Sequence, residues 1–378
     1  MSLNTGNIGG NPNFNTTGAI KIPVGTSAQR PGNPRVGDLR FNTDLGVLEI
    51  YAGATPQWHP IGSVASPFSA TFVSLFTTSS RTAAGSIGSA YNNSQLNGQV
   101  TLNGGKQIWS VPSSGWWRFD AYGAQGGTNS TGVGGGGARI RGDFFLEQGE
   151  TLEILCGSAG YLSTNDCDTG GGGGTYVVKQ GGTSVSDILV IAAGGGGASN
   201  QSFNSQGRGD AANYSGTGSD GKHGDASQIA SNGAGGRGGS GGYAGDRSLS
   251  GSARGNPGGG FYAGLASYTP NPTWSETRAG ASYLDGAQGG TANDAANSFG
   301  GFGGGGGGHG NCFISGGGGG GWNGGGCEVQ YTSYHGGQGG GSINNGGLNP
   351  VGTSGANRNN TVGGQPNHGR VEVTKIGL

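Results

Sequence analysis

The chain has 378 residues, of which 94 are glycine, and its 19 basic and 20 acidic side chains leave a formal net charge of −1. The glycines follow no Gly-X-Y period and prolines number only 13, which excludes a collagen triple helix. The near-neutral charge argues against a protein that binds nucleic acid electrostatically, and no run of about 18 apolar residues predicts a membrane span.

A composition so rich in glycine is also typical of low-complexity disorder. The chain, however, contains 13 Phe, 12 Tyr and 6 Trp, which a solvated tail does not need, so we expect it to fold. The opening residues, MSLNTGNIGG, have neither the basic nor the apolar region of a signal peptide, and export by that route is not expected.

Residues 20–62 are typical of short β-strands separated by turns. Strands are expected at 20–24, 38–42 and 47–51, with a hairpin loop between the last two, and Trp58 begins a further strand. Such a segment is too small to bury a hydrophobic core alone, so we expect it to need neighbouring chains, for example in a trimer.

This segment resembles a small module common in bacteriophage tail and fibre proteins. The module has the pattern P-x-G-T-x-x-x-R-P, then G-x-(L/I)-R-(F/Y)-N-T, then (L/V)-E-(V/I)-(Y/W) and a final W. The positions that fill it are Pro23, Gly25, Thr26, Arg30, Pro31, Gly37, Arg40, Phe41, Asn42, Thr43, Glu49, Tyr51 and Trp58. The resemblance implies that residues 1–65 attach the chain to a virus particle or start a trimer. A chance β-hairpin is the alternative.

From residue 66 onward, ordinary β-sequence brackets a glycine-rich body. Alternating apolar and polar residues at 115–123 and 138–146 predict half-buried strands, and helix signals are nearly absent. The other expected strands are 67–76, 100–102, 106–111, 151–156, 175–179, 188–193 and 369–376. This order predicts a β-sandwich over 66–193 that receives its final strand, 369–376, after a long insertion.

The glycine runs of the insertion are short, pure and repeated, unlike the mixed glycine and serine of flexible linkers. Ordering glycine has a high backbone entropy cost, which some interaction must offset. Extended helices of the polyproline-II type have no internal hydrogen bonds. Without Cβ atoms, several of them can pack side by side with every backbone group bonded to a neighbour. We therefore expect a bundle of glycine helices at about 194–365.

The order of these motifs resembles the glycine-rich extracellular region of the animal receptors anaplastic lymphoma kinase and leukocyte tyrosine kinase. The similar sequences lie at 107–127, 144–160, 170–179, 188–197, 300–325 and 368–373. The resemblance implies a tumour-necrosis-factor-like β-sandwich with an inserted bundle of polyglycine-II helices, but it implies no signalling. We therefore expect an all-β chain, with a small β-hairpin module at 1–65 and a glycine-rich domain at 66–378.

No pattern in the sequence predicts catalysis, a cofactor or a metal centre. Fragments of G-x-G-x-x-G are expected by chance among 94 glycines, and 216–223 lacks the Ser/Thr and the preceding strand of a phosphate loop. Acidic and amide side chains at 165–168 offer oxygen ligands to calcium, but their spacing departs from an EF-hand and favours a solvated turn. The Arg-Gly-Asp tripeptide at 141–143 falls in an expected strand and is interpreted as chance.

The four cysteines fall into two close pairs, Cys156 with Cys167 and Cys312 with Cys327. We interpret both pairs as local disulfides, which an oxidising exterior would favour. Release by lysis, on a virus particle, is one route to that exterior. Buried free thiols are the alternative for Cys156 and Cys167, and a metal pair with His309 is the alternative for Cys312.

Aromatic and amide residues interrupt the glycine-rich body at 260–274 and 328–335, where short loops would suit recognition of a glycan or a protein. The candidate receptor-binding residues are Tyr268, Trp274, Tyr331 and Tyr334. The alternative is that such rings only cap the glycine bundle, and for Trp322 and Phe302 the two interpretations have equal weight.

Together these features predict a bacteriophage virion protein, namely a tail fibre or receptor-binding adhesin. We expect a homotrimer on the virion tail, assembled in the host cytoplasm, with other tail or fibre proteins and a host-surface glycan or protein as partners. Nucleic acid and membrane insertion are not expected. The main alternative is a structural virion protein, such as a head decoration or a fibre shaft component. A secreted bacterial surface protein is another, and a polysaccharide-cleaving enzyme would need paired carboxylates that the sequence does not offer.

Overall fold

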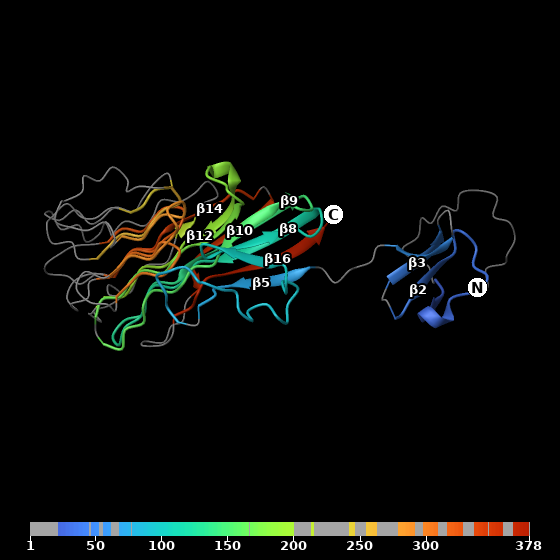
Figure 1. Cartoon of the computed structure of the whole chain (residues 1–378), viewed down its shortest axis with the longest axis horizontal. Helices are drawn as coiled ribbons and strands as arrows, with labels where there is room; N and C mark the ends of the chain where they lie inside the picture. Colours follow the sequence, from blue (N-terminus) through green and yellow to red (C-terminus); the bar gives the residue numbers. More distant parts are fainter. Residues whose placement is uncertain are drawn as a thin grey trace. The chain divides into compact units, whose positions relative to one another are not determined.

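A computed structural model divides the chain into two compact units, Met1–Pro67 and Phe68–Leu378. The residues that the structure describes are 22–44, 47–52, 56–61, 68–76, 78–165, 167–199, 213–214, 242–245, 255–262, 279–291, 298–308, 316–327, 336–346, 348–357 and 366–377. Their regular secondary structure is β-strand with short 3-10 turns, so the expected all-β class is confirmed (Figure 1).

The first unit contains a four-stranded sheet in the order β1-β2-β3-β4. Its strands are β1 (Val24–Gly25), β2 (Leu39–Asn42), β3 (Val47–Ala52) and β4 (Gln57–Ile61), and a 3-10 turn, η1 (Ser27–Gln29), follows β1. β2 pairs antiparallel with β3, with Arg40 opposite Glu49, which confirms the expected hairpin, whereas β1 runs parallel to β2.

The second unit contains two larger sheets. The five-stranded sheet has the order β15-β9-β8-β16-β5, formed by β5 (Ser69–Val73), β8 (Gly115–Tyr122), β9 (Gly137–Leu146), β15 (Leu348–Asn357) and β16 (Arg370–Gly377). The seven-stranded sheet has the order β13-β14-β12-β11-β10-β7-β6. Its strands are β6 (Val100–Asn103), β7 (Lys106–Ser110), β10 (Thr151–Leu155), β11 (Thr175–Lys179), β12 (Ile188–Ala192), β13 (Asn213–Tyr214) and β14 (Gly341–Asn344).

The last strand, β16, lies inside the five-stranded sheet. Val373 pairs with Phe119 of β8 on one side, and Val371 pairs with Phe72 of β5 on the other. The expected return of the final strand to the sheet is therefore confirmed. Because β5 and β8 precede the glycine-rich body, the sheet is complete only when the chain has passed through that body.

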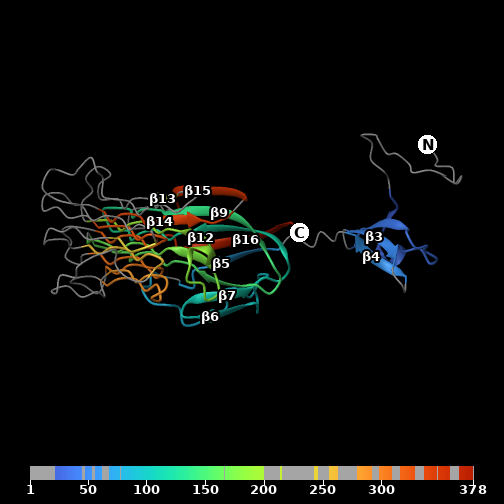
Figure 2. The ribbon, with the colours of Figure 1, turned by 90° about the horizontal axis from the view of Figure 1, so that it is seen from above.

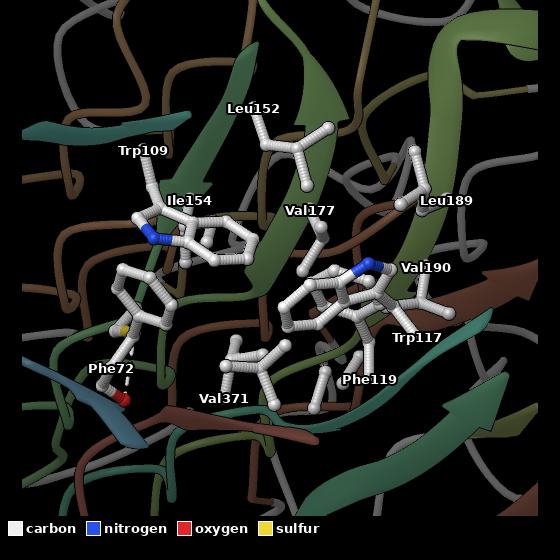
Figure 3. Packing of buried hydrophobic residues seen from close by; sticks show 14 of the residues in the cluster. Phe72, Trp109, Trp117, Phe119, Leu152, Ile154, Val177, Leu189, Val190 and Val371 are labelled. Atoms are coloured by element: carbon white, nitrogen blue, oxygen red, sulfur yellow. Dashed lines mark hydrogen bonds between the residues drawn. The ribbon is translucent and has the colours of Figure 1, made fainter. Parts of the chain in front are cut away.

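The two sheets face each other across a core of aromatic and branched side chains (Figure 3). The rings of Trp109 in β7 and Trp117 in β8 meet edge-to-face with centroids 5.4 Å apart, and the ring of Phe72 lies 5.8 Å from that of Trp109. Along β8, Trp117 and Phe119 are fully buried while Trp116, Arg118 and Tyr122 are half-buried, which follows the alternation seen in the sequence.

Beyond the strand ends, glycine-rich segments lie side by side and bond to one another through their backbones (Figure 2). We call this region the glycine lattice. Its described segments are 123–136, 157–165, 167–174, 193–199, 242–245, 255–262, 279–291, 298–308, 316–327 and 336–340.

Gly172 illustrates how closely these segments approach. Its N–H donates to the Gly195 carbonyl at 2.8 Å, and its own carbonyl accepts from the N–H of Gly320 at 3.0 Å. A Cβ atom at Gly172 would lie 2.4 Å from the Ala124 carbonyl oxygen, on yet another segment. The backbone thus has close neighbours on several sides, and only glycine fits.

The glycine lattice also joins the two sheets. Facing sheets normally lie about 10 Å apart and are separated by side chains. Here Ala138 of β9 donates to the carbonyl of Ala193, just after β12, at 2.9 Å, and Ala124, after β8, donates to the carbonyl of Gly173, before β11, at 3.0 Å. At this end of the strands the residues are alanine and glycine. Their small size lets the two sheets approach and join in one hydrogen-bonded array.

The lattice differs in extent from the region expected at about 194–365. Segments 123–136, 157–165 and 167–174 also belong to it, because they follow β8 and β10, lead into β9 and β11, and bond to the later glycine runs. Conversely, β14 and β15 fall inside the expected bundle yet pair with β12 and β9.

Candidate functional site

The glycine lattice has one end at the sheets and one end away from them, which we call the distal end. Segment 193–199 leads away from β12. Gly197 donates to the Gly317 carbonyl at 2.9 Å and Gly194 donates to the Gly320 carbonyl at 2.8 Å, so segment 316–321 runs antiparallel to it, back toward the sheets. Residues 199 and 316 therefore both lie at the distal end.

Other segment ends meet there. Thr169, which leads into β11, donates to the carbonyl of Ala198 at 2.9 Å, and Gly308 donates to the carbonyl of Ser298 at 2.7 Å. These bonds fix chain segments that are far apart in sequence next to one another. The lattice thus gives the distal end a base made of hydrogen-bonded backbone.

Asn129 is a buried clamp at this end. Its amide donates to the carbonyls of Cys167 and Ser199, both at 3.0 Å, and its side-chain oxygen accepts from the N–H groups of Thr131, at 3.0 Å, and Gly132, at 2.6 Å. One fully buried side chain therefore ties together three separate segments. No local pattern predicts this role, since Thr-Asn-Ser-Thr-Gly is typical of an ordinary turn.

The described surface around this clamp is uncharged and mostly polar. Its outward side chains are Ser130, Thr164 and Asn165, with Thr131, Tyr161 and Leu162 half-buried. The Tyr161 ring lies 5.0 Å from that of Phe299. Among the described residues of this turn, the acidic side chain is that of Asp168, and it is fully buried. Hydroxyl, amide and aromatic groups are therefore what this part of the surface offers to a ligand.

The four predicted receptor-binding residues, Tyr268, Trp274, Tyr331 and Tyr334, lie outside the described residues, in 263–278 and 328–335. For 328–335, both flanks lie at the distal end, where Gln338 donates to the carbonyl of Gly326 at 3.1 Å. For 263–278, the preceding Tyr262 lies at the sheet end. The segment with Tyr331 and Tyr334 is therefore flanked by the distal end, whereas the segment with Tyr268 and Trp274 begins at the sheet end. The sequence alone does not distinguish these two pairs.

Aromatic rings gather where the lattice meets the sheets. Phe302 and Trp322 are both buried, and Phe261 stacks on Tyr283 with centroids 5.2 Å apart. For Phe302 and Trp322, the interpretation as caps of the glycine segments is the one that fits. Tyr243, 42% exposed, is the outermost ring of this group.

A largely buried ionic group links the same rings to the seven-stranded sheet. Tyr283 donates to Glu153 Oε2 at 2.6 Å, and Lys106 Nζ, which lies 2.9 Å from the same oxygen, also lies 3.8 Å from the centre of the Tyr283 ring. Burial tends to raise the pKa of Glu153, but the hydrogen bonds from Tyr283 and Lys106 outweigh it and hold that pKa below its ordinary value. The carboxylate is thus charged and structural.

The cysteine pairing predicted from the sequence is wrong. Cys156 is a buried thiol whose Sγ donates to the Phe72 carbonyl at 3.4 Å, and its burial raises its pKa. Cys327 is also outside any disulfide, whereas Cys167 is disulfide-bonded. Cys156 lies in the core between the sheets and Cys167 at the distal end, so closeness in sequence misled the prediction. Cys312 lies outside the described residues.

The Arg-Gly-Asp tripeptide is engaged within the five-stranded sheet. Asp143 is almost fully buried and accepts two bonds from Arg118, at 2.7 and 2.8 Å, while Arg141 Nε donates to Asp120 at 3.0 Å. Both charged side chains of the tripeptide are therefore used in cross-strand pairs of β8 and β9, consistent with its interpretation as chance.

The first unit holds a buried ionic network made from the positions that carry its resemblance to the phage module. Glu49 accepts from Arg30 and from Asn42 Nδ2, the latter at 3.1 Å, and lies 3.4 Å from Arg40 Nη1. Arg40 Nη2 also donates to the Thr26 carbonyl at 2.8 Å. The hydrogen bond from Arg30 lowers the pKa of Glu49. These motif residues thus form one network in which each supplies a hydrogen-bond or ion-pair partner to another.

No family model matches the chain. Among the described residues, no group of three or more acidic, histidine or cysteine side chains is arranged to hold a metal ion. A search of the same residues finds no helix with the length and apolar character needed to cross a membrane.

Proposed function

We propose that the chain is a bacteriophage virion protein, a tail fibre or receptor-binding adhesin that recognises the host cell surface. The observation that carries this proposal is the backbone hydrogen bonding that holds distant segments together at the distal end, with Asn129 as a clamp. A base fixed in this way would present recognition segments with little ordering cost on binding.

We further propose that the glycine lattice is a bundle of polyglycine-II helices inserted into a tumour-necrosis-factor-like sandwich. Support comes from residues such as Gly172, whose backbone bonds to different segments on its two sides. The motif order shared with the extracellular region of the anaplastic lymphoma kinase family supports it as well.

The chemistry of the distal end favours a neutral ligand such as a glycan or an uncharged protein surface. Hydroxyl and amide groups surround the Asn129 clamp, and the aromatic candidates Tyr331 and Tyr334 belong to a segment flanked by the distal end. With few charges in the contact, binding should depend little on salt.

The N-terminal module would attach the chain, as a homotrimer, to other tail or fibre proteins during assembly in the host cytoplasm. Its support is the resemblance to the phage module and the satisfied network around Glu49.

Immunogold labelling of particles from a producing lysate tests the location, with an antibody raised against residues 68–378. Gold at the distal tail is the expected result. Gold over the head would favour a decoration protein instead, and the absence of gold on particles would overturn a virion role.

Competition binding to host cells tests the site. The double variant Tyr331→Ala and Tyr334→Ala should lose binding, whereas Tyr243→Ala should keep it, because Tyr243 is an exposed tyrosine at the sheet end of the lattice. Equal binding by both variants would contradict the assignment of the distal end.

A further inference from the structure

The sheet of the first unit has two faces of opposite character. Arg40 and Glu49 are cross-strand partners, so both point to the face that carries the ionic network. Side chains alternate along a strand, and cross-strand partners share a face, so the neighbours of these residues point the other way. That second face, which we call the apolar face, is formed by Val24, Leu39, Phe41, Leu48, Ile50 and Ile61, with His59 beside them.

The apolar face is open to solvent in the single chain. Val24 is 67% exposed, Leu39 42% and Ile61 38%, and the other three residues are only half-buried. Exposed apolar patches of this kind mark interaction surfaces in soluble proteins.

The opposite face buries charges and amides where a small domain usually buries its core. Arg40, Asn42 and Glu49 are at most 3% exposed, and among the described residues of this unit Val47 is the only buried apolar side chain. A buried ionic network adds little net stability. A unit of this size without a hydrophobic core needs another source of stability.

We propose that the apolar face is a self-association surface, covered by the same face of further copies of this chain, so that the copies share one hydrophobic core. Among the described residues of β1 to β4, no Asp, Glu, Lys or Arg lies on this face, so identical copies meet there without repulsion between like charges. Contact through one common patch also gives a closed assembly. The inference rests on the homotrimer of the proposed function and deepens it by naming the surface through which the copies meet; it does not depend on receptor binding.

Sedimentation velocity of the purified full chain, over a dilution series, tests this directly. Wild-type protein should sediment as a multiple of the 37.1-kDa chain. Val24→Asp should shift it to the single-chain mass. Val36→Asp is the matched control, because Val36 is equally exposed, at 68%, but lies in the turn before β2 and not on the apolar face.

Hydrogen exchange on the same samples guards against a variant that merely misfolds. Amides of β2 and β3 in the wild type should lose protection on dilution, at the concentration where the mass falls. A single-chain mass for the wild type at all concentrations would overturn the proposal, since the face would then be covered by another protein or by nothing. An unchanged mass for Val24→Asp would overturn it as well.

Discussion

The sheet core and the glycine lattice both exclude water from the folded chain, but the first does so by packing side chains and the second by packing backbones. Between the sheets, side chains such as Trp109, Trp117 and Phe119 fill the space and the backbones of the two sheets stay apart. In the lattice there are almost no side chains, and the backbones themselves are in contact.

The difference lies in how each region responds to a change in volume. A side-chain core loses stability gradually, because neighbours relax around a smaller residue. The lattice has no such freedom, because the atoms next to each glycine are carbonyl groups already held by hydrogen bonds. Adding one carbon to a lattice glycine should therefore lower the unfolding free energy more than removing several carbons from a side chain of the core.

The largest expected effect is that of Gly195→Ala. A Cβ at Gly195 would lie 1.9 Å from the Gly135 carbonyl oxygen. We expect a loss of more than about 4 kcal/mol of unfolding free energy, or failure to fold, measured by thermal unfolding of the full chain. Gly85→Ala is the control, since no atom lies within 4 Å of a Cβ there. A melting temperature for Gly195→Ala equal to that of Gly85→Ala would refute the close approach.

In the core, Leu152→Ala should cost about 2–5 kcal/mol, because a fully buried side chain is removed and a cavity remains. The same thermal measurement applies. Val185→Ala, at a residue 41% exposed, should change the unfolding free energy by no more than about 0.5 kcal/mol. The comparison between core and lattice would fail if Leu152→Ala proved more damaging than Gly195→Ala.

Asn129→Ala should have a smaller and more local effect, of about 1–3 kcal/mol for the carbonyl and N–H groups left without a partner. Amides of 128–132 and 167–169 should exchange faster, while those of β10 and β12 should not change. Asn165→Ala, at an exposed asparagine of the same end, should leave the exchange as in the wild type. Faster exchange throughout the sheets would show that Asn129 is not a local clamp.

The smallest effect concerns Glu153, which joins the lattice turn at Tyr283 to the sheet. Because its pKa is lower in the folded state than its ordinary value of 4.5, its contribution to stability is present above about pH 4.5 and is lost as the pH falls through the folded value. Glu153→Gln removes this part of the pH dependence. Melting temperatures of the two proteins should converge in acid, and parallel curves would contradict the assignment.

Much of the sheet structure could be predicted because alternation of apolar and polar residues reports a half-buried strand. The expected strands at 138–146 and 175–179 match β9 and β11 closely. β14 and β15 could not be found in this way, because their sequences, GSIN and LNPVGTSGAN, lack alternation. They are strands because β12 and β9 offer edges for pairing.

The candidate site was predicted less well, for a physical reason. The glycine runs indicated backbone packing, but a residue with no side chain carries no information about which segment is its neighbour. The joining of the two sheets at Ala138 and Ala193, the clamp at Asn129 and the true state of Cys156 all depend on that arrangement. Spacing along the chain therefore suggested a Cys156–Cys167 pair that the fold keeps apart.

The glycine runs are folded parts of the structure and not flexible linkers. Hydrogen exchange of the full chain measures this most directly, by comparing amides of 194–197 and 316–321 with those of β10 and β12. We expect the amides of Gly194, Gly195, Gly197 and 317–321 to be protected to a degree similar to the strand amides, because each of these N–H groups donates to a carbonyl of a neighbouring segment. Exchange of the glycine amides at the rate of an unfolded chain, with the strands still protected, would contradict it.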